Sequence, residues 1–197
     1  IERQLVMTLK RAIKKPIQNI LGKYPVIAVT GPRQSGKTTM LKTEFPDYRY
    51  VNLENPDMRS YAESDPNSFL LEYDKFVVFD EVQRVPHLFS YIQSVVDESG
   101  IMGQYILSGS QNFHLMESIT QSLAGRVAIF KLFPFDHNEM KTAGWLHEDD
   151  FLFNLVKGFY PAIYDREIPS KTFYTNYVKT YIQRDVTQLI NIRNMRL

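Results

Sequence analysis

The sequence GPRQSGKT, residues 31–38, fits the pattern G-x-x-x-x-G-K-[ST]. Residues 26–29 before it read as a short buried strand, and residues 38–43 after it can begin a helix. In this strand–loop–helix context the pattern is typical of a loop whose backbone N–H groups wrap a phosphate chain. Lys37 is expected to reach the β- and γ-phosphates, and the Thr38 hydroxyl is expected to hold Mg²⁺. An ordinary glycine turn with a solvated lysine is the alternative, which the flanking elements disfavour.

Every residue of the phosphate-binding loop is expected to contact the nucleotide. Its residues and the next threonine are the predicted nucleotide ligands: Gly31, Pro32, Arg33, Gln34, Ser35, Gly36, Lys37, Thr38 and Thr39.

A second motif, FVVFDE (residues 76–81), carries two carboxylates at the end of an apolar run. If the run is a parallel strand, both carboxylates lie at the sheet edge where the loop also lies. Asp80 then fits the Mg²⁺ partner, and Glu81 is placed to orient and deprotonate an attacking water. A water-activating carboxylate suits a hydrolase and would be a liability in a small-molecule kinase. The alternative is a strand that ends in a solvated acidic turn.

The remaining pattern alternates short apolar strands with helical segments. Such alternation predicts an α/β fold with a parallel sheet covered on both faces. The expected strands are residues 26–29, 48–53, 75–79, 104–107 and 127–130. Helices are expected to begin at Asn55-Pro56 and Asp65-Pro66, to open at Pro86 and end at Gly100, and to run from about 113 to 124.

Two further positions are candidates for completing the site. Residues 108–111 follow the fourth strand, so Ser108 or a neighbour is placed to hydrogen-bond the γ-phosphate or the lytic water. A serine–glycine turn that caps the next helix explains the same residues. Arg126, before the fifth strand, is a candidate for neutralising charge on the transferring phosphoryl group. A surface ion pair is its alternative.

Composition narrows the function classes. The 197 residues include 23 Lys plus Arg and 22 Asp plus Glu, so the charge does not support wholesale nucleic-acid binding. There is no cysteine, which excludes disulfides and thiolate metal sites. No apolar run approaches a membrane span of about 18 residues, and no signal-type segment opens the chain. We therefore expect a cytoplasmic protein without a membrane partner.

Several motifs in a fixed order resemble a known family. They are GPRQSGKTT (31–39), NLE (52–54), FDEVQ (79–83), LSGS (107–110), LAGRV (123–127), LFPF (132–135) and YIQRDV (181–186). Together they are similar to a prokaryotic family of AAA-type ATP-binding proteins with a C-terminal domain of unknown function. The resemblance spans nearly the whole chain and is more specific than the loop alone.

The resemblance implies an AAA-like three-layer sandwich with strand order 5-1-4-3-2, and ATP with Mg²⁺ as cofactors. It places Thr38 and Asp80 at the metal, Glu81 as the base, Ser108 near the sensor position and Arg126 near an arginine-finger position. The expected preference for adenine over guanine rests on the resemblance, because the sequence contains no Asn-Lys-x-Asp motif that would read guanine. Members of the family continue further, so the chain is expected to be a fragment, as is also indicated by the absence of an initial Met.

The domain organisation follows from the same pattern. We expect an amphipathic helix over residues 1–18 that Pro16 bends or ends, an ATPase core over 19–140, and a helical extension over 151–197 that starts the C-terminal domain. Tyrosines in the extension (Tyr174, Tyr177 and Tyr181) alternate with basic residues. They suit stacking on nucleic-acid bases, but packing of the helix explains them more simply.

The sequence as a whole predicts a Mg²⁺-dependent ATPase that acts through Lys37, Thr38, Asp80 and Glu81. A nucleotide-gated interaction switch with slow or no turnover, and a DNA-associated motor or loader, are the alternatives. An unknown protein partner is expected. Oligomeric state, and whether Arg126 acts in its own subunit or a neighbour's, are left open.

Overall fold

The computed structural model describes residues 9–110, 113–146 and 151–182. They form two compact units. The core unit consists of residues 10–32 and 36–133; the carboxy-terminal unit consists of the described residues among 1–9, 33–35 and 134–197. The core predicted from the sequence ends at residue 140, whereas residues 134–140 are grouped here with the carboxy-terminal unit. Within the described ranges, no helix has the length and apolar character needed to cross a lipid bilayer.

The core unit is built on a sheet of five parallel strands in the order β2-β3-β4-β1-β5. The strands are β1 (Val26–Gly31), β2 (Arg49–Asn52), β3 (Val77–Asp80), β4 (Tyr105–Ser110) and β5 (Val127–Lys131). β1 and β4 lie in the middle and are buried along their whole length, as expected of parallel strands covered on both faces. The predicted α/β class and the strand order 5-1-4-3-2, which is the same order read from the other edge, are confirmed.

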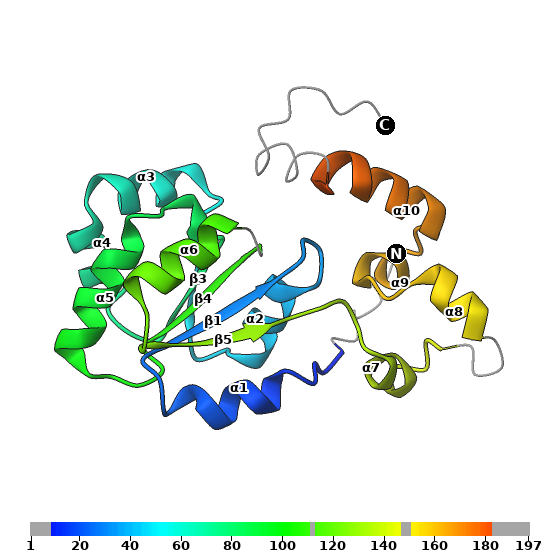
Figure 1. The fold of residues 1–197 in the computed structure, drawn as a ribbon, viewed down its shortest axis with the longest axis horizontal. Coiled ribbons are helices and arrows are strands. Elements are labelled where there is room, and N and C mark those ends of the chain that lie inside the picture. Colours follow the sequence, from blue (N-terminus) through cyan, green and yellow to red (C-terminus); the bar gives the residue numbers. More distant parts are fainter. Residues whose placement is uncertain (1–8, 111–112, 147–150, 183–197) are drawn as a thin grey trace, which may run out of the picture. The chain divides into compact units, whose positions relative to one another are not determined.

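Helices cover both faces of this sheet, giving the predicted three layers (Figure 1). On one face Ile17 and Met40 pack against Ile27 and the other alternate side chains of the strands. On the opposite face Phe69 and Phe89 belong to a larger cluster that includes Phe79. The first face carries α1 (Lys14–Leu21) and α2 (Lys37–Glu44); the second carries α3 (Pro56–Ser64), α4 (Pro66–Glu72), α5 (Leu88–Ser99) and α6 (Phe113–Ser122).

The predicted helix boundaries in the middle of the core are confirmed by their caps. Asn55 accepts hydrogen bonds from the backbone N–H groups of Asp57 and Met58 at 2.8 and 3.3 Å, and the Asp65 carboxylate accepts one from Ser68 at 3.1 Å. A proline follows each cap and fits the first helical position because that position needs no N–H donor. Gly100 ends α5 in the left-handed conformation, with φ of 63°.

Several boundaries differ from the sequence prediction, and the helix expected to open at Pro86 begins at Leu88. The first described helix begins only at Lys14, so Pro16 lies in its first turn, where a proline is tolerated, and neither bends nor ends it. Residues 1–8 of the predicted helix lie outside the described residues. β4 continues through Ser110, so Ser108 is part of a strand, and the alternative interpretation of these residues as a serine–glycine turn is wrong.

The carboxy-terminal unit is helical. Its elements are α7 (His137–Thr142), α8 (Phe151–Lys157), α9 (Pro161–Asp165), α10 (Ser170–Tyr177) and the π-helix η2 (Val178–Ile182). Asp136 and Glu139 form a reciprocal capping box at the start of α7. The ring of Tyr177 lies 5.0 Å from Tyr160 and 5.7 Å from Phe173, between ring centroids. This packing supports the simpler interpretation of the tyrosines.

Candidate functional site

The phosphate-binding loop leaves the sheet at the carboxyl end of β1 and enters α2. Gly36 precedes the helix in the left-handed conformation, with φ of 91°, and its carbonyl accepts the first helical hydrogen bond from Met40 at 2.9 Å. Residues with a Cβ are strained in this conformation, so glycine suits the turn. The loop therefore aims the N-terminus of α2, with its N–H groups, toward the space above the sheet edge.

Lys37 folds back across the loop. Its ammonium group donates hydrogen bonds to the carbonyls of Gly31 at 3.0 Å and Pro32 at 2.9 Å, and only 6% of the residue is exposed. A buried lysine needs partners because its charge is costly to desolvate. The two carbonyls hold the positive charge inside the loop, and the predicted contact of Lys37 with the β- and γ-phosphates stays a prediction.

Thr38 and Asp80 are brought together from two elements. Asp80 ends β3, and its carboxylate accepts a hydrogen bond from the Thr38 hydroxyl at 2.6 Å. A hydroxyl that donates to a carboxylate keeps its oxygen lone pairs for another ligand. Within the described residues, no cluster of three or more His, Asp or Glu side chains could hold a metal. The Thr38 hydroxyl and the single Asp80 carboxylate are oxygen ligands of the kind that suit Mg²⁺, which proteins usually bind through one or two carboxylates together with substrate phosphates and water.

Tyr50 also reaches this pair, and the sequence analysis missed it. It lies on β2, which pairs with β3, and its hydroxyl donates to the same Asp80 oxygen that Thr38 contacts. Burial, followed by the hydrogen bond to Asp80, raises the pKa of Tyr50, so the phenol stays protonated and donating. The alternation of side chains along the strands could have identified it. Tyr50 pairs with Val78, and Val78 lies two residues before Asp80, so Tyr50 and Asp80 lie on the same face of the sheet.

Glu81 follows directly but turns away from the strand. Its backbone adopts the left-handed conformation, with φ of 57°, and its N–H donates to the Asp80 carboxylate at 3.1 Å. Non-glycine residues rarely take this conformation outside constrained sites. The Glu81 carboxylate accepts a hydrogen bond from Gln83 at 2.5 Å. Gln83 belongs to the 3₁₀ turn η1 (Val82–Arg84) and had no role in the sequence analysis.

Ser108 lies beside these groups in the sheet. It pairs with Asp80 on one side and with Val29 on the other, and it is 1% exposed. Its hydroxyl has no hydrogen-bond partner among the described residues. A buried hydroxyl without a partner is uncommon and calls for an explanation. The structure thus brings Ser108 to the predicted edge, with a polar atom available there.

Arg126 is not brought to this edge within its own chain. Its carbonyl accepts from Val26, the first residue of β1, so it lies at the amino edge of the sheet. Its guanidinium donates two hydrogen bonds to Asp97, at 2.5 and 2.8 Å. These hydrogen bonds lower the pKa of Asp97. The alternative interpretation, a surface ion pair, describes its contacts in this chain.

The tip of the loop is grouped with the carboxy-terminal unit. There the Arg33 carbonyl accepts a hydrogen bond from Tyr177 at 3.2 Å, and Gln34 donates to the Tyr181 hydroxyl at 2.9 Å. Ser35 is fully buried, whereas Thr39, the last of the predicted ligands, is exposed on α2.

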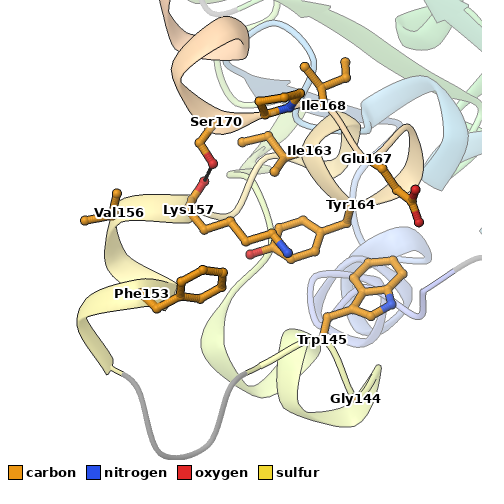
Figure 2. Close-up of a pocket in the computed structure, with 11 residues that line it drawn as sticks. Gly144, Trp145, Phe153, Val156, Lys157, Ile163, Tyr164, Glu167, Ile168 and Ser170 are labelled. Atoms are coloured by element: carbon orange, nitrogen blue, oxygen red, sulfur yellow. Dashed lines mark hydrogen bonds between the residues drawn. The ribbon is translucent and has the colours of Figure 1, made fainter.

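A separate concavity of about 640 Å³ lies within the carboxy-terminal unit. Figure 2 shows Trp145 beside Tyr164, whose rings stack at 5.4 Å, and the Lys157 side chain extending over Tyr164. The Lys157 ammonium lies 4.4 Å from the Tyr164 ring centroid. The lysine is therefore engaged with aromatic faces.

Comparison with known proteins agrees with this geometry. A family model described as an AAA domain matches residues 23–141. A second, described as a domain of unknown function, matches residues 148–197. Uncharacterized protein Rv2008c of Mycobacterium tuberculosis and Uncharacterized protein Mb2031c of Mycobacterium bovis are each 28% identical to the chain over 181 residues. The match covers 88% of the chain and 38% of each relative, so the chain spans well under half of their length.

Two solved structures share the fold. The Walker-type ATPase PABY2304 of Pyrococcus abyssi superimposes with a TM-score of 0.55 at 15% identity, covering 92% of this chain and 75% of that one. The AMPPCP-bound DnaA of Aquifex aeolicus superimposes with a TM-score of 0.52 at 18% identity, covering 90% of this chain and 65% of that one. At such identities the likeness concerns the fold, and function must be argued from the site.

Proposed function

Because the chain belongs to the AAA domain family, we propose that it binds ATP with Mg²⁺ and hydrolyses the bond to the γ-phosphate. The observation that carries the proposal is the contact of 2.6 Å between Thr38 and Asp80, beside a loop that encloses Lys37. A hydroxyl, a carboxylate and an ammonium group thus converge on one edge of the sheet. These are the groups that hold a metal and a polyphosphate in phosphate-loop enzymes.

Each residue has a distinct task in this proposal. The loop N–H groups and Lys37 would bind the phosphate chain, and the Thr38 oxygen would hold Mg²⁺ while its hydroxyl keeps the hydrogen bond to Asp80. Mg²⁺ supplies positive charge that offsets the charge developing on the phosphate oxygens. Glu81 orients a water and accepts its proton as the water attacks. Ser108 donates its hydroxyl hydrogen toward the γ-phosphate or that water.

The direct test is phosphate release by the chain with Mg–ATP, with EDTA added to a parallel sample. Steady release that stops with EDTA supports the enzyme. A nucleotide-gated switch instead predicts ATP binding by calorimetry with little or no release, and a partner that binds only the ATP form. If Mg–ATP does not bind at all, both the ATPase and the nucleotide-gated switch are excluded.

A DNA-associated motor is the third hypothesis, and the net charge of the chain does not favour it. With 23 basic and 22 acidic residues, the chain has a net charge of only +1, a small excess with which to neutralise phosphates. Such a motor would show DNA affinity that falls steeply as salt rises. The cellular partner to which hydrolysis is coupled is proposed to be a protein.

The Tyr50→Phe substitution tests the metal site. The phenol orients the Asp80 carboxylate, so we expect its loss to raise the half-saturating Mg²⁺ concentration for hydrolysis about 10-fold, the effect typical of groups that support a metal ligand. Tyr48→Phe is the matched control, because the Tyr48 hydroxyl donates to the carbonyl of Gly103, which precedes β4, and not to Asp80. An unchanged Mg²⁺ requirement in the Tyr50 variant would contradict the assigned contact.

We propose that Arg126 acts, if the chain assembles, in the site of a neighbouring subunit. Arg126→Ala should then lower turnover about 10³-fold in the assembly, the size expected when a fixed guanidinium is lost. Mixing Arg126→Ala chains with Glu81→Gln chains should restore activity, because the second variant supplies Arg126 to the intact Glu81 of the first. A mixture no more active than the sum of its parts, or wild-type turnover of Arg126→Ala alone, would contradict this role.

A further inference from the structure

Gln83 connects the two sides of the site. Its side-chain NH₂ group donates to the Glu81 carboxylate at 2.5 Å and to the Ser110 hydroxyl at 3.2 Å. Ser110 is the last residue of β4 and pairs with Gly31, where the phosphate-binding loop begins. One carboxamide therefore joins the turn after β3 to the end of the strand next to the loop.

The orientation of this carboxamide follows from the chemistry of its partners. An ionised carboxylate only accepts hydrogen bonds, so the NH₂ side of Gln83 must face Glu81. The carbonyl oxygen of Gln83 then points to the opposite side, where it is buried without a hydrogen-bond partner among the described residues. A buried carbonyl left without a partner is a cost to the fold. The Gln83 carboxamide thus keeps its hydrogen bond to Glu81 while its carbonyl oxygen stays without a hydrogen bond within the part of the chain that the structure describes.

Gly109 makes room for this arrangement. A Cβ atom at position 109 would lie 2.1 Å from the Gln83 carbonyl oxygen and 3.1 Å from its Cδ. Real Cβ atoms do not approach other atoms so closely, so any larger residue would push the carboxamide away. A side chain at position 109 would therefore be accommodated only if the Gln83 carboxamide moved from its present position.

We propose that Gln83 is a positioning residue that holds the Glu81 carboxylate in the orientation needed to activate water. The inference rests on the proposed function, because it assigns Gln83 a role through Glu81. Glutamate has three rotatable side-chain bonds, and the contact with Gln83 restricts them before the substrate arrives. Gln83 does not touch the nucleotide, so its loss should change turnover and leave binding alone.

The first test is Gln83→Met, which keeps the length of the side chain and removes the donor. We expect kcat for ATP to fall about 10- to 100-fold, as for a misplaced catalytic group, while KM and the affinity for Mg–ATP stay at wild-type values. Gln121→Met is the matched control: Gln121 also donates to a glutamate, Glu117, at 3.4 Å, but is exposed on α6. Its kcat should be unchanged.

Two further variants separate positioning from general damage. Gly109→Ala leaves Gln83 in place chemically but displaces its carboxamide, so kcat should fall as in Gln83→Met. In a Glu81→Gln background, Gln83→Met should cause no additional loss, because the group it positions has already been removed.

Several results would overturn the proposal. These are wild-type or raised kcat in Gln83→Met, the same fractional loss with and without the Glu81 carboxylate, or an increase in KM without loss of kcat. If Gln83→Met does not fold, Gly109→Ala with wild-type kcat would overturn it instead. No Mg–ATP-dependent phosphate release by the wild-type chain would mean that the proposed function itself has failed. Wild-type turnover of Glu81→Gln would remove Glu81 from the mechanism and the role of Gln83 with it, whereas loss there with an intact Gln83→Met enzyme would remove only the role of Gln83.

Discussion

Glu81→Gln is expected to lower ATP turnover by at least about 100-fold while Mg–ATP still binds with wild-type affinity. The substituted amide has the shape of glutamate but cannot take a proton from water. The metal pair is untouched, since Thr38 and Asp80 contact each other directly at 2.6 Å. The amide oxygen can also still accept the hydrogen bond from Gln83, so the turn after β3 keeps its geometry.

The measurement is single-turnover phosphate release together with calorimetric titration of the same preparation. Glu98→Gln is the matched control, because Glu98 is exposed on α5 and the same change of charge there should leave the rate as it is. Hydrolysis by Glu81→Gln at the wild-type rate would remove Glu81 from the mechanism. Loss of binding along with turnover would mean that Glu81 helps to hold the nucleotide. The trapped ATP form is also suited to retaining a partner protein in a pull-down.

The parts of the site that were predicted from the sequence are those whose geometry is local. The phosphate-binding loop, its lysine and its threonine occupy adjacent positions, so one turn of backbone fixes them. Asp80 was predictable because an apolar strand delivers its next residue to a known edge of a parallel sheet. The caps at Asn55 and Asp65 depend on neighbouring residues in the same way.

The parts that were missed depend on which strands become neighbours. Tyr50 contacts Asp80 only because β2 pairs with β3, and Gln83 reaches Ser110 only because β3 pairs with β4. Gly109 reads as a turn residue in the sequence, yet it lies within β4, and Gln83 occupies the space where a side chain at 109 would be. Such requirements appear only once the chain has folded.

For Arg126 the prediction from sequence was incomplete for a different reason, because its position at the amino edge of the sheet could have been derived. It precedes a strand of a parallel sheet, and residues before such a strand lie at the amino edge, opposite the carboxyl edge that binds ligands. The order of motifs placed it near an arginine-finger position, and the direction of β5 places it beside Asp97. Within one chain the amino edge does not meet the carboxyl edge, and this is why we propose that Arg126 acts in the site of another subunit.

Lys37→Ala is expected to weaken Mg–ATP binding by at least about 30-fold. Removing one partner of a buried charge contact costs about 2 kcal/mol or more, and 1.4 kcal/mol corresponds to a factor of ten in affinity. The ammonium is 6% exposed and already held between the carbonyls of Gly31 and Pro32. It therefore needs little reorganisation to meet a phosphate, and without it the loop presents two carbonyl oxygens where negative charge must bind.

The titration is best made in a Glu81→Gln background, so that hydrolysis does not consume the ligand and the two largest effects are separated. Lys75→Ala is the control, because Lys75 is an exposed lysine before β3 and its removal changes the net charge equally. Affinity lost in both variants would indicate a general effect of charge. Affinity retained in Lys37→Ala would mean that the buried ammonium only closes the loop on itself, and the case for a phosphate chain at residues 31–38 would then rest on the backbone N–H groups alone.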